Sequence, residues 1–298
     1  MNKLLILWQF SRPHTIIGST LSILSIFALA MGTTAPVIIA LRLLPLSLLS
    51  AWACNIYITG LNQWTDIEVD KINKPWLPIA AGTLSKPNAL RIVIACGIIA
   101  LVSAISLSIP FFMLILSIMA IGTAYSLPPL NLKRSHLWAA AAISVVRGLL
   151  VNIGFYLHFR HEMMGEWVFT TAIIPLTVFI TAFSLGIAWF KDIPDTEGDV
   201  IYKFSTLAVT SGRKQAFLSG VIVVSIAYGY IILTAFMDQL PNPLYFIMTH
   251  LAALLIFLWQ AYILKVTNDK KVKRFYLFFW GLFFMEYLLY PLGFYLPT

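Results

Sequence analysis

Charged residues and cysteines are both scarce in this sequence of 298 residues, and each scarcity excludes a class of protein. Asp, Glu, Lys and Arg together make up 11% of the chain, whereas a typical soluble domain contains about 25%. With 60% hydrophobic residues, the chain is too apolar for a soluble protein, and we expect a lipid bilayer around it. Cys54 and Cys96 lie in apolar stretches without metal-ligand spacing. We therefore expect both to be reduced packing residues rather than metal ligands.

Long apolar stretches recur along the chain, and each approaches the ~20 residues that a membrane-spanning helix needs. Nine of them lie near residues 14–32, 36–62, 88–109, 111–127, 137–158, 167–190, 215–236, 243–264 and 275–296. The sequence therefore predicts an all-α, polytopic membrane protein with nine transmembrane helices. The short connections leave no room for a soluble domain, so we expect residues 1–298 to form a single transmembrane domain. Polar residues interrupt the first apolar run and no small-residue cleavage site follows it, which argues against a signal peptide.

Basic residues exceed acidic ones and give a formal net charge of +8. In a soluble protein this excess would suggest nucleic-acid binding, but here the basic residues gather on alternate connections between the spans. They precede the first span and follow the second, fourth, sixth and eighth: Lys3 and Arg12; Lys71, Lys74, Lys86 and Arg91; Lys133 and Arg134; Lys191, Lys203, Arg213 and Lys214; and Lys265, Lys270, Lys271, Lys273 and Arg274. By the positive-inside rule, these loops and the N-terminus face the cytoplasm and the C-terminus does not. We expect contact with lipid and not with nucleic acid, and the sequence leaves the oligomeric state open.

Acidic residues are concentrated in two short clusters, one after the second span and one after the sixth, so both clusters return to the same face of the membrane. Asn62, Asp66 and Asp70 stand at i, i+4 and i+8 and form one stripe on a helix. The other acidic stripe has the spacing i, i+3 and i+7, provided that the helix continues past a proline; its members are Asp192, Asp195 and Asp199. Glu68 and Glu197 fall off the two stripes and are weaker candidates.

Carboxylates packed this closely raise one another's pKa unless a cation neutralises them. Mg²⁺ suits such a place, because it prefers oxygen ligands and is commonly held by carboxylates together with substrate phosphates. The stripes therefore predict a metal-bridged diphosphate at Asp66, Asp70, Asp192, Asp195 and Asp199, above an apolar bundle that can hold a hydrocarbon tail. The alternative is that these acids only balance nearby lysines at the membrane face.

Several cations and one ring could serve such a site. Lys133 and Arg134 lie on the same face as both clusters, and we assign them to the departing diphosphate; we attribute most other loop lysines, Lys74 among them, to membrane topology. Arg147 falls inside the fifth apolar stretch, where a charge costs at least a few kcal/mol. We expect it to bind either the donor diphosphate or an acceptor carboxylate, with structural pairing as the alternative. Tyr125 either flanks a developing cation or anchors the chain at the membrane interface.

Residues 62–75 and 191–199 resemble the two aspartate-rich motifs of the UbiA superfamily of intramembrane prenyltransferases, and within it they are most similar to the homogentisate phytyltransferases. Residues 10–18, 122–126, 132–134 and 286–292 support this resemblance. It implies nine transmembrane helices around a central cavity, use of Mg²⁺, and a prenyl diphosphate and an aromatic acceptor as substrates. It also implies that the prenyl diphosphate is gripped by Asn62, Asp66, Asp70, Asp192, Asp195 and Asp199. The further candidates for catalytic or substrate-binding roles are Arg12, Tyr125, Lys133, Arg134, Arg147 and Lys191.

The activity that the resemblance implies is Mg²⁺-dependent transfer of a phytyl or geranylgeranyl group to the ring of homogentisate, with decarboxylation, in tocopherol or prenylquinone biosynthesis. One alternative is a UbiA relative with another substrate, such as chlorophyllide, 4-hydroxybenzoate or solanesyl diphosphate. A different class is a cation-coupled transporter, since ionisable groups in spans often mark ion paths. A transporter is expected to place its acids near the bilayer midplane, whereas these lie at helix ends.

Overall fold

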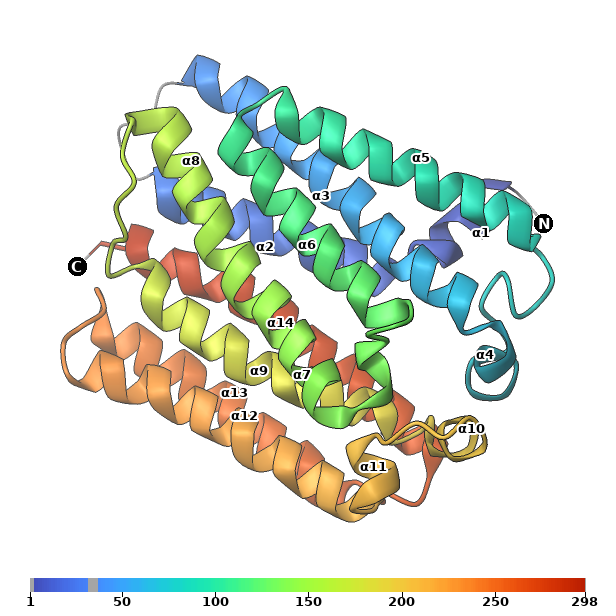
Figure 1. Cartoon of the computed structure of the whole chain (residues 1–298). Helices are drawn as coiled ribbons and strands as arrows, with labels where there is room; N and C mark the ends of the chain where they lie inside the picture. The colour runs from blue at the N-terminus through green and yellow to red at the C-terminus, as the bar shows by residue number, and fades with distance from the viewer. Residues whose placement is uncertain (1–2, 32–36, 298) are drawn as a thin grey trace.

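The structure is a computed structural model that describes residues 3–31 and 37–297, and these residues are mostly helical (Figure 1). The first half contains α1 (Lys3–Phe10), α2 (Pro13–Met31), α3 (Val37–Thr65), α4 (Ile67–Asn73), α5 (Lys86–Ile105), α6 (Ile109–Ser126), a 3₁₀ turn (Leu132–Arg134) and α7 (His136–Ser144). The second half contains a π-helical segment (Val145–Gly154), α8 (Phe155–Met164), α9 (Ile173–Asp192), α10 (Thr196–Ile201), α11 (Leu207–Thr210), α12 (Arg213–Phe236), α13 (Pro243–Ile263) and α14 (Asp269–Tyr295).

Within the described residues, nine helices are long and apolar enough to cross a membrane, as the sequence predicts. The fifth is one continuous span, His136–Met164, formed by α7, the π-helical segment and α8. Three predicted boundaries differ most from the structure. The fifth span ends at Met164 and not near residue 158. The sixth span begins at Ile173 and not near residue 167, because Gly165 ends α8 with a φ of 72° and the chain that follows is not helical. The ninth begins at Asp269 and not near residue 275, because its charged first turns are helical as well.

The span α9 lies at the centre of the bundle, where it packs against α7, the π-helical segment, α12 and α14. Its apolar side chains are buried among aromatic rings. The ring of Phe183 stacks on Phe279 of α14 with 4.1 Å between centroids, and Phe190 meets the edge of the same ring at 4.9 Å. Aromatic pairs of this kind stabilise the packing beyond the area they bury. The central position of α9 holds its C-terminal end, which carries Asp192, against the other helices.

Large apolar side chains cover the outer faces of α5, α12 and α13, as expected for surfaces that contact lipid. Examples are Ile98 on α5, Ile226 on α12 and Trp259 on α13, which are between 58% and 62% exposed. Cys54 is buried and Cys96 half-buried, and both are free thiols, which confirms their prediction as reduced residues. The chain is therefore an integral, multi-pass membrane protein.

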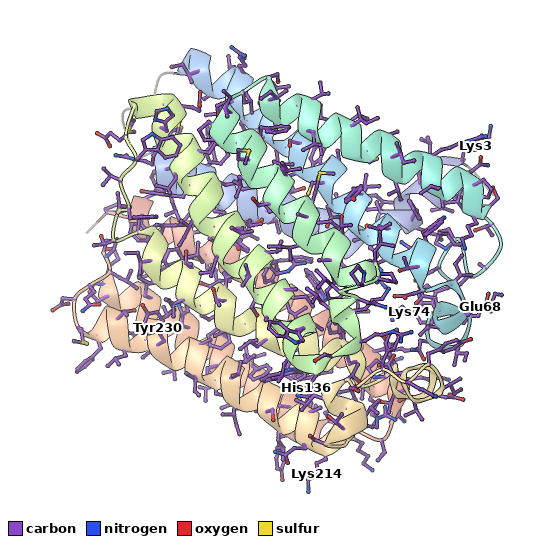
Figure 2. The ribbon with its side chains drawn as sticks, viewed as in Figure 1. Lys3, Glu68, Lys74, His136, Lys214 and Tyr230 are labelled. Carbon is purple, nitrogen blue, oxygen red and sulfur yellow. The ribbon has the colours of Figure 1, made fainter. Side chains whose placement is uncertain are left out.

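The short helices α4 and α10 lie together at one end of the bundle, although more than 120 residues separate them in sequence (Figure 1). Figure 2 shows Lys3, Glu68, Lys74 and Lys214 at this end, whereas Tyr230 lies toward the other. The two acidic clusters, which directly precede or belong to these helices, therefore reach the same face, as the sequence predicts. We call this face the polar end of the bundle.

Candidate active site

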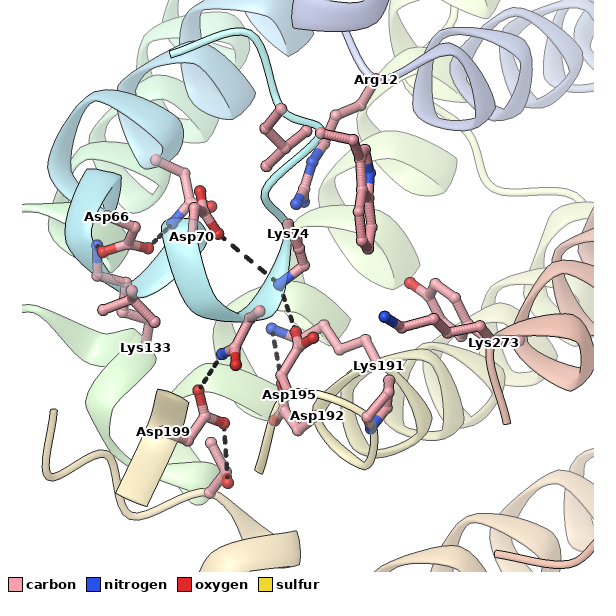
Figure 3. A pocket seen from close by; sticks show the side chains of 18 of the residues that line it. Arg12, Asp66, Asp70, Lys74, Lys133, Lys191, Asp192, Asp195, Asp199 and Lys273 are labelled. Atoms are coloured by element: carbon pink, nitrogen blue, oxygen red, sulfur yellow. Dashed lines mark hydrogen bonds and ion pairs between the residues drawn. The ribbon is translucent and has the colours of Figure 1, made fainter. Parts of the chain in front are cut away.

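A cavity of about 530 Å³ opens at the polar end and brings both acidic clusters together (Figure 3). The sequence-predicted residues that line it come from six α-helices or their ends and from the 3₁₀ turn: Arg12, Asn62, Asp66, Asp70, Tyr125, Lys133, Lys191, Asp192, Asp195 and Asp199. Apolar side chains such as Val69, Leu77 and Leu277 complete its wall. The cavity therefore joins charged groups suited to a polyanion with apolar surface suited to a hydrocarbon.

The side chains of the first acidic stripe stay on one face, although the stripe crosses a break between two helices. The span α3 ends at Thr65 and α4 begins at Ile67, with Asp66 between them. The backbone N–H of Asp66 still donates to the carbonyl of Asn62 at 3.0 Å, and that of Asp70 donates to the carbonyl of Asp66 at 2.7 Å. This helical spacing keeps all three side chains on one face. The Asn62 amide also donates to Asp66 Oδ2 at 2.9 Å and so orients the carboxylate.

The second acidic stripe does not lie on a continuous helix. The span α9 ends at Asp192, and α10 starts only at Thr196. Ile193 still has helical backbone angles, but proline at position 194 has no N–H to donate to the helix. The three carboxylates nevertheless converge on the cavity, and each of them is less than 9% exposed. The predicted grouping of Asp192, Asp195 and Asp199 is therefore correct, although its helical basis is wrong.

Asn73 joins α4 directly to α10, a role that sequence analysis missed. Its amide N–H donates to Asp199 Oδ1 at 3.3 Å, and its carbonyl oxygen accepts from the backbone N–H of Gly198 at 3.0 Å. The hydroxyl of Thr206 donates to the other oxygen of Asp199, also at 3.3 Å. Asn73 follows Asp70 by three residues on the same short helix, and this helical spacing was the signal that could have identified it.

Lys74 is the second functional residue that sequence analysis passed over. Its ammonium group forms an ion pair with Asp195 and lies 3.9 Å from Asp70 Oδ1, so it bridges the two acidic clusters (Figure 3). Lys74 continues the series Asn62, Asp66, Asp70 by another four residues, which was the available signal. Its neighbour Lys71 instead pairs with Glu68 at 2.8 Å on the exposed surface.

Two further lysines form hydrogen bonds or ion pairs with other predicted site residues. The ammonium group of Lys133 is buried and donates to Asp66 Oδ1 at 2.6 Å and to the Thr65 hydroxyl at 2.7 Å. Lys191 donates to the phenol oxygen of Tyr125 at 2.8 Å and lies 3.4 Å from Asp192. Tyr125 therefore lies in the cavity wall and not only at the membrane interface, which places an electron-rich ring beside the charged groups.

Not every predicted residue reaches this cavity. Arg134 lies outside its lining and stacks instead on Phe204, with its guanidinium 5.5 Å from the ring centroid. Arg147 also lies outside the lining, deeper in the bundle against Trp280 and Phe283. Glu68 is exposed and so is Glu197 of the second motif, which agrees with their weaker ranking.

Burial and ion pairing together set the pKa values of the charged residues outside the membrane spans. It raises the pKa of Asp70 to about 6, against the opposing effect of Lys74, and raises the pKa of Asp199 to about 7, with a further contribution from Asp192 and Asp195. The pKa of Lys74 is raised, because Asp195 and Asp70 outweigh the effect of its own burial. Burial lowers the pKa of Lys133 despite its contact with Asp66. The carboxylates thus favour the approach of further positive charge.

The side chains at the cavity provide oxygen donors for a hard cation, together with ammonium groups for an anion. Within the part of the chain that the structure describes, no three Asp, Glu, His or Cys side chains are already clustered as a metal site. The aspartates are instead paired with Lys74, Lys133 and Lys191, or hydrogen-bonded to amide and hydroxyl groups. Chemically, the arrangement can hold a polyanion with its counter-cations.

Comparison with known proteins gives consistent matches over most of the chain. Residues 21–283 match the model of the UbiA prenyltransferase family. A homogentisate phytyltransferase from Synechocystis sp. is 39% identical over 98% of this chain and 96% of its own length. A chloroplastic homogentisate solanesyltransferase from Arabidopsis thaliana is also 39% identical, over 95% of this chain and 75% of its own length. Among solved structures, a UbiA homolog from Archaeoglobus fulgidus bound to GPP and Mg²⁺ gives a TM-score of 0.66 at 18% identity, and the match covers 96% of this chain and 99% of that one.

Proposed function

The chain belongs to the UbiA prenyltransferase family, and from this premise we propose that it transfers a phytyl or geranylgeranyl group from its diphosphate to the aromatic ring of homogentisate. Relatives with homogentisate in their names match nearly the whole chain, which supports the choice of acceptor. The observation that carries the proposal is the convergence of five aspartates and five basic residues on one cavity in an apolar bundle; the basic residues are Arg12, Lys74, Lys133, Lys191 and Lys273.

The donor atoms of the cavity fit a divalent metal ion, and we propose Mg²⁺. Asp66, Asp70, Asp192, Asp195 and Asp199 supply only carboxylate oxygens, which are the ligands that Mg²⁺ prefers. Asp70 and Asp199 are buried and their pKa values are raised, so an added cation at these residues would relieve the repulsion between neighbouring carboxylates. The related structure with GPP and Mg²⁺ supports this assignment. When bound, the metal supplies charge stabilisation for the diphosphate as it leaves.

The lysines of the site have a complementary role in the proposal. Lys74, between Asp70 and Asp195, and Lys133, beside Asp66, can turn from their carboxylates to the oxygens of an arriving diphosphate. The carbon–oxygen bond of the prenyl donor then breaks and its electron pair leaves with the diphosphate, so that the prenyl carbon becomes cation-like. Preorganised positive charge around the leaving group lowers the barrier to this step.

The second half of the reaction takes place on the acceptor. A ring carbon of homogentisate forms a bond to the prenyl carbon and the ring then loses its proton, while the ring of Tyr125 faces the developing positive charge. Loss of the carboxyl group as CO₂ leaves an electron pair on the side-chain carbon, which takes up one proton and becomes a methyl group. The products are a methylated prenyl quinol, CO₂ and diphosphate.

The proposal is tested by supplying membranes that contain the protein with homogentisate, Mg²⁺ and a panel of phytyl, geranylgeranyl and solanesyl diphosphates, and by identifying products by mass. The solanesyl donor belongs in the panel because the solanesyltransferase relative is as similar as the phytyltransferase. We expect a decarboxylated quinol carrying a phytyl or geranylgeranyl chain. Release of diphosphate without a prenylated quinol would contradict the proposal.

A further inference from the structure

Arg147 is a charged residue inside a membrane span, and none of the residues that the structure describes forms an ion pair with it. Its guanidinium lies 4.9 Å from the ring centroid of Trp280 and 5.3 Å from that of Phe283. Its Nε is buried without a hydrogen-bond partner, and no acidic side chain of the described residues pairs with it. A buried cation is costly unless it is paired, so the geometry around Arg147 favours an anion that comes from outside the chain.

The backbone at Arg147 is held in an unusual form. The residue lies in the π-helical segment Val145–Gly154, and wide turns of this kind occur frequently at functional sites. The amide of Asn152 donates to the carbonyls of Arg147 at 3.0 Å and Gly148 at 2.8 Å. Its carbonyl oxygen accepts from the hydroxyl of Tyr287 at 2.9 Å. Asn152 thus fixes the turn that directs the guanidinium.

The surroundings of Arg147 connect it to the aspartate-lined cavity. His14 and Tyr276 belong to the cavity wall. Both rings contact Trp280, with centroids 4.9 and 6.3 Å away, and Trp280 in turn contacts Arg147. The guanidinium is therefore one layer of aromatic rings below the site that we assign to the diphosphate.

We propose that Arg147 binds the carboxylate of the aromatic acceptor, and that Asn152 is its positioning residue. The inference rests on the proposed function and adds a recognition site for the acceptor. A planar guanidinium matches a carboxylate with two parallel hydrogen bonds. The buried rings of Trp280 and Phe283 lie against the guanidinium and hold it in place. The diphosphate already has Arg12, Lys74, Lys133 and Lys191 within its own cavity, and Arg147 is not part of that lining.

The test compares two ligands and three variants in detergent-solubilised protein. The ligands are homogentisate and its side-chain amide, 2,5-dihydroxyphenylacetamide, which has the same ring but no charge. The variants are Arg147→Gln, Arg147→Lys and Asn152→Ala, and Arg42→Gln is the control because Arg42 is an exposed arginine whose guanidinium donates to the Ser106 carbonyl. Binding is measured directly by calorimetry, and the KM values for acceptor and donor are measured separately.

We expect Arg147→Gln to weaken homogentisate binding by roughly 10- to 100-fold, the loss of a charge-assisted hydrogen-bonded pair, and to leave binding of the amide unchanged. Arg147→Lys should recover part of the difference, because it restores the charge without the planar grip. Asn152→Ala should raise the acceptor KM and leave the donor KM unchanged. The control should resemble the unaltered protein.

Three results would overturn the inference. Equal weakening of acid and amide, together with lower thermal stability, would assign Arg147 a structural role. Weaker donor binding with unchanged homogentisate binding would assign it to the diphosphate. Unchanged binding of every ligand would also contradict the inference. Failure of the proposed function has a different signature, because binding needs no turnover: Arg147-dependent binding of homogentisate without any prenylated product would support the subsite and reject the reaction.

Discussion

Individual charges at the polar end are matched to one another over short distances. Lys133 lies against Asp66, Lys74 between Asp70 and Asp195, and Lys191 beside Asp192. A carboxylate or ammonium group that is removed from water must be compensated, and here each compensates the other. A diphosphate with its metal carries charges of both signs, so it can replace these pairs without leaving a buried charge unmatched.

Lys74 gives the sharpest test of this exchange. We expect Lys74→Met to lower prenyl transfer by about 100-fold, the usual effect of losing one preorganised charge at a reacting centre. The loss should appear mainly in kcat, because the charge on the diphosphate grows as the bond breaks. Lys71→Met is the matched control, since Lys71 lies three residues earlier on the exposed surface. Equal rates for the two variants would remove Lys74 from the site.

Asp66 tests the metal assignment. Asp66→Asn keeps a carbonyl oxygen that can accept from Lys133, so the variant should fold, but it loses the negative charge of the carboxylate. We expect turnover to fall by about 100-fold or more and the Mg²⁺ concentration for half-maximal rate to rise. Glu68→Gln, an exposed residue two positions away, should behave normally. Chelation of divalent metal should abolish activity in the unaltered protein, and persistence of activity after chelation would contradict the metal assignment.

At the scale of residues, the aspartates could be predicted, as could Lys133 and Lys191, but Lys74 could not. Asp66 and Asp199 stand out because acidic residues are rare in the sequence and occur in spaced clusters. Lys74 has the same appearance as the many lysines that set membrane orientation, and only the fold shows that it reaches across to Asp195. The apolar sequence around Arg147 was enough to single this residue out. It did not show that Arg147 lies apart from the diphosphate cavity.

At the scale of helices, length and hydropathy sufficed to predict nine spans, because the bilayer imposes both. The breaks within and after those spans depend on local backbone chemistry that hydropathy does not report. The non-helical segment after Gly165 and the end of α9 before Pro194 are two examples. The π-helical turn at Arg147 is a third, since its carbonyls are satisfied by Asn152 and not by a pattern visible in the sequence.

The contact between α4 and α10 depends on a glycine. A Cβ added at Gly198 would lie 2.5 Å from Asn73 Oδ1, too close without a shift of that side chain. We expect Gly198→Ala to break the hydrogen bonds of Asn73 to Gly198 and Asp199, to lower the melting temperature and to reduce activity by about 10-fold, because a small misplacement of catalytic groups is costly. The measurement is a thermal unfolding curve beside a rate assay.

Gly229→Ala is the control for that substitution, because a Cβ at Gly229 meets nothing within 4 Å. Alanine is the better helix former by roughly 1 kcal/mol, so this variant should be as stable as the unaltered protein or more stable. If Gly198→Ala shows the same gain and full activity, then the close approach of the two helices is not required.

At the scale of the whole molecule, charge is distributed unevenly along the membrane normal. The basic residues that follow the even-numbered spans lie at the polar end, whereas Arg42 and Arg160 occur near the opposite end. The described chain also begins and ends at opposite ends of the bundle (Figure 1). An odd number of spans is consistent with termini at opposite ends of the bundle. Because the basic residues gather at the polar end, we propose by the positive-inside rule that this end faces the cytoplasm.

Cysteine labelling at the two ends of α12 tests this orientation. Lys214 lies in its first turn at the polar end, and Gln239 lies in the connection just beyond Phe236, its last residue, at the other end; both are exposed. After replacement of Cys54 and Cys96 by alanine, a membrane-impermeant maleimide added to intact cells should modify Gln239→Cys at once. It should modify Lys214→Cys only after the membrane is permeabilised. The reverse pattern would place the diphosphate cavity on the outer face, and labelling of both positions in intact cells would mean that α12 does not cross the membrane.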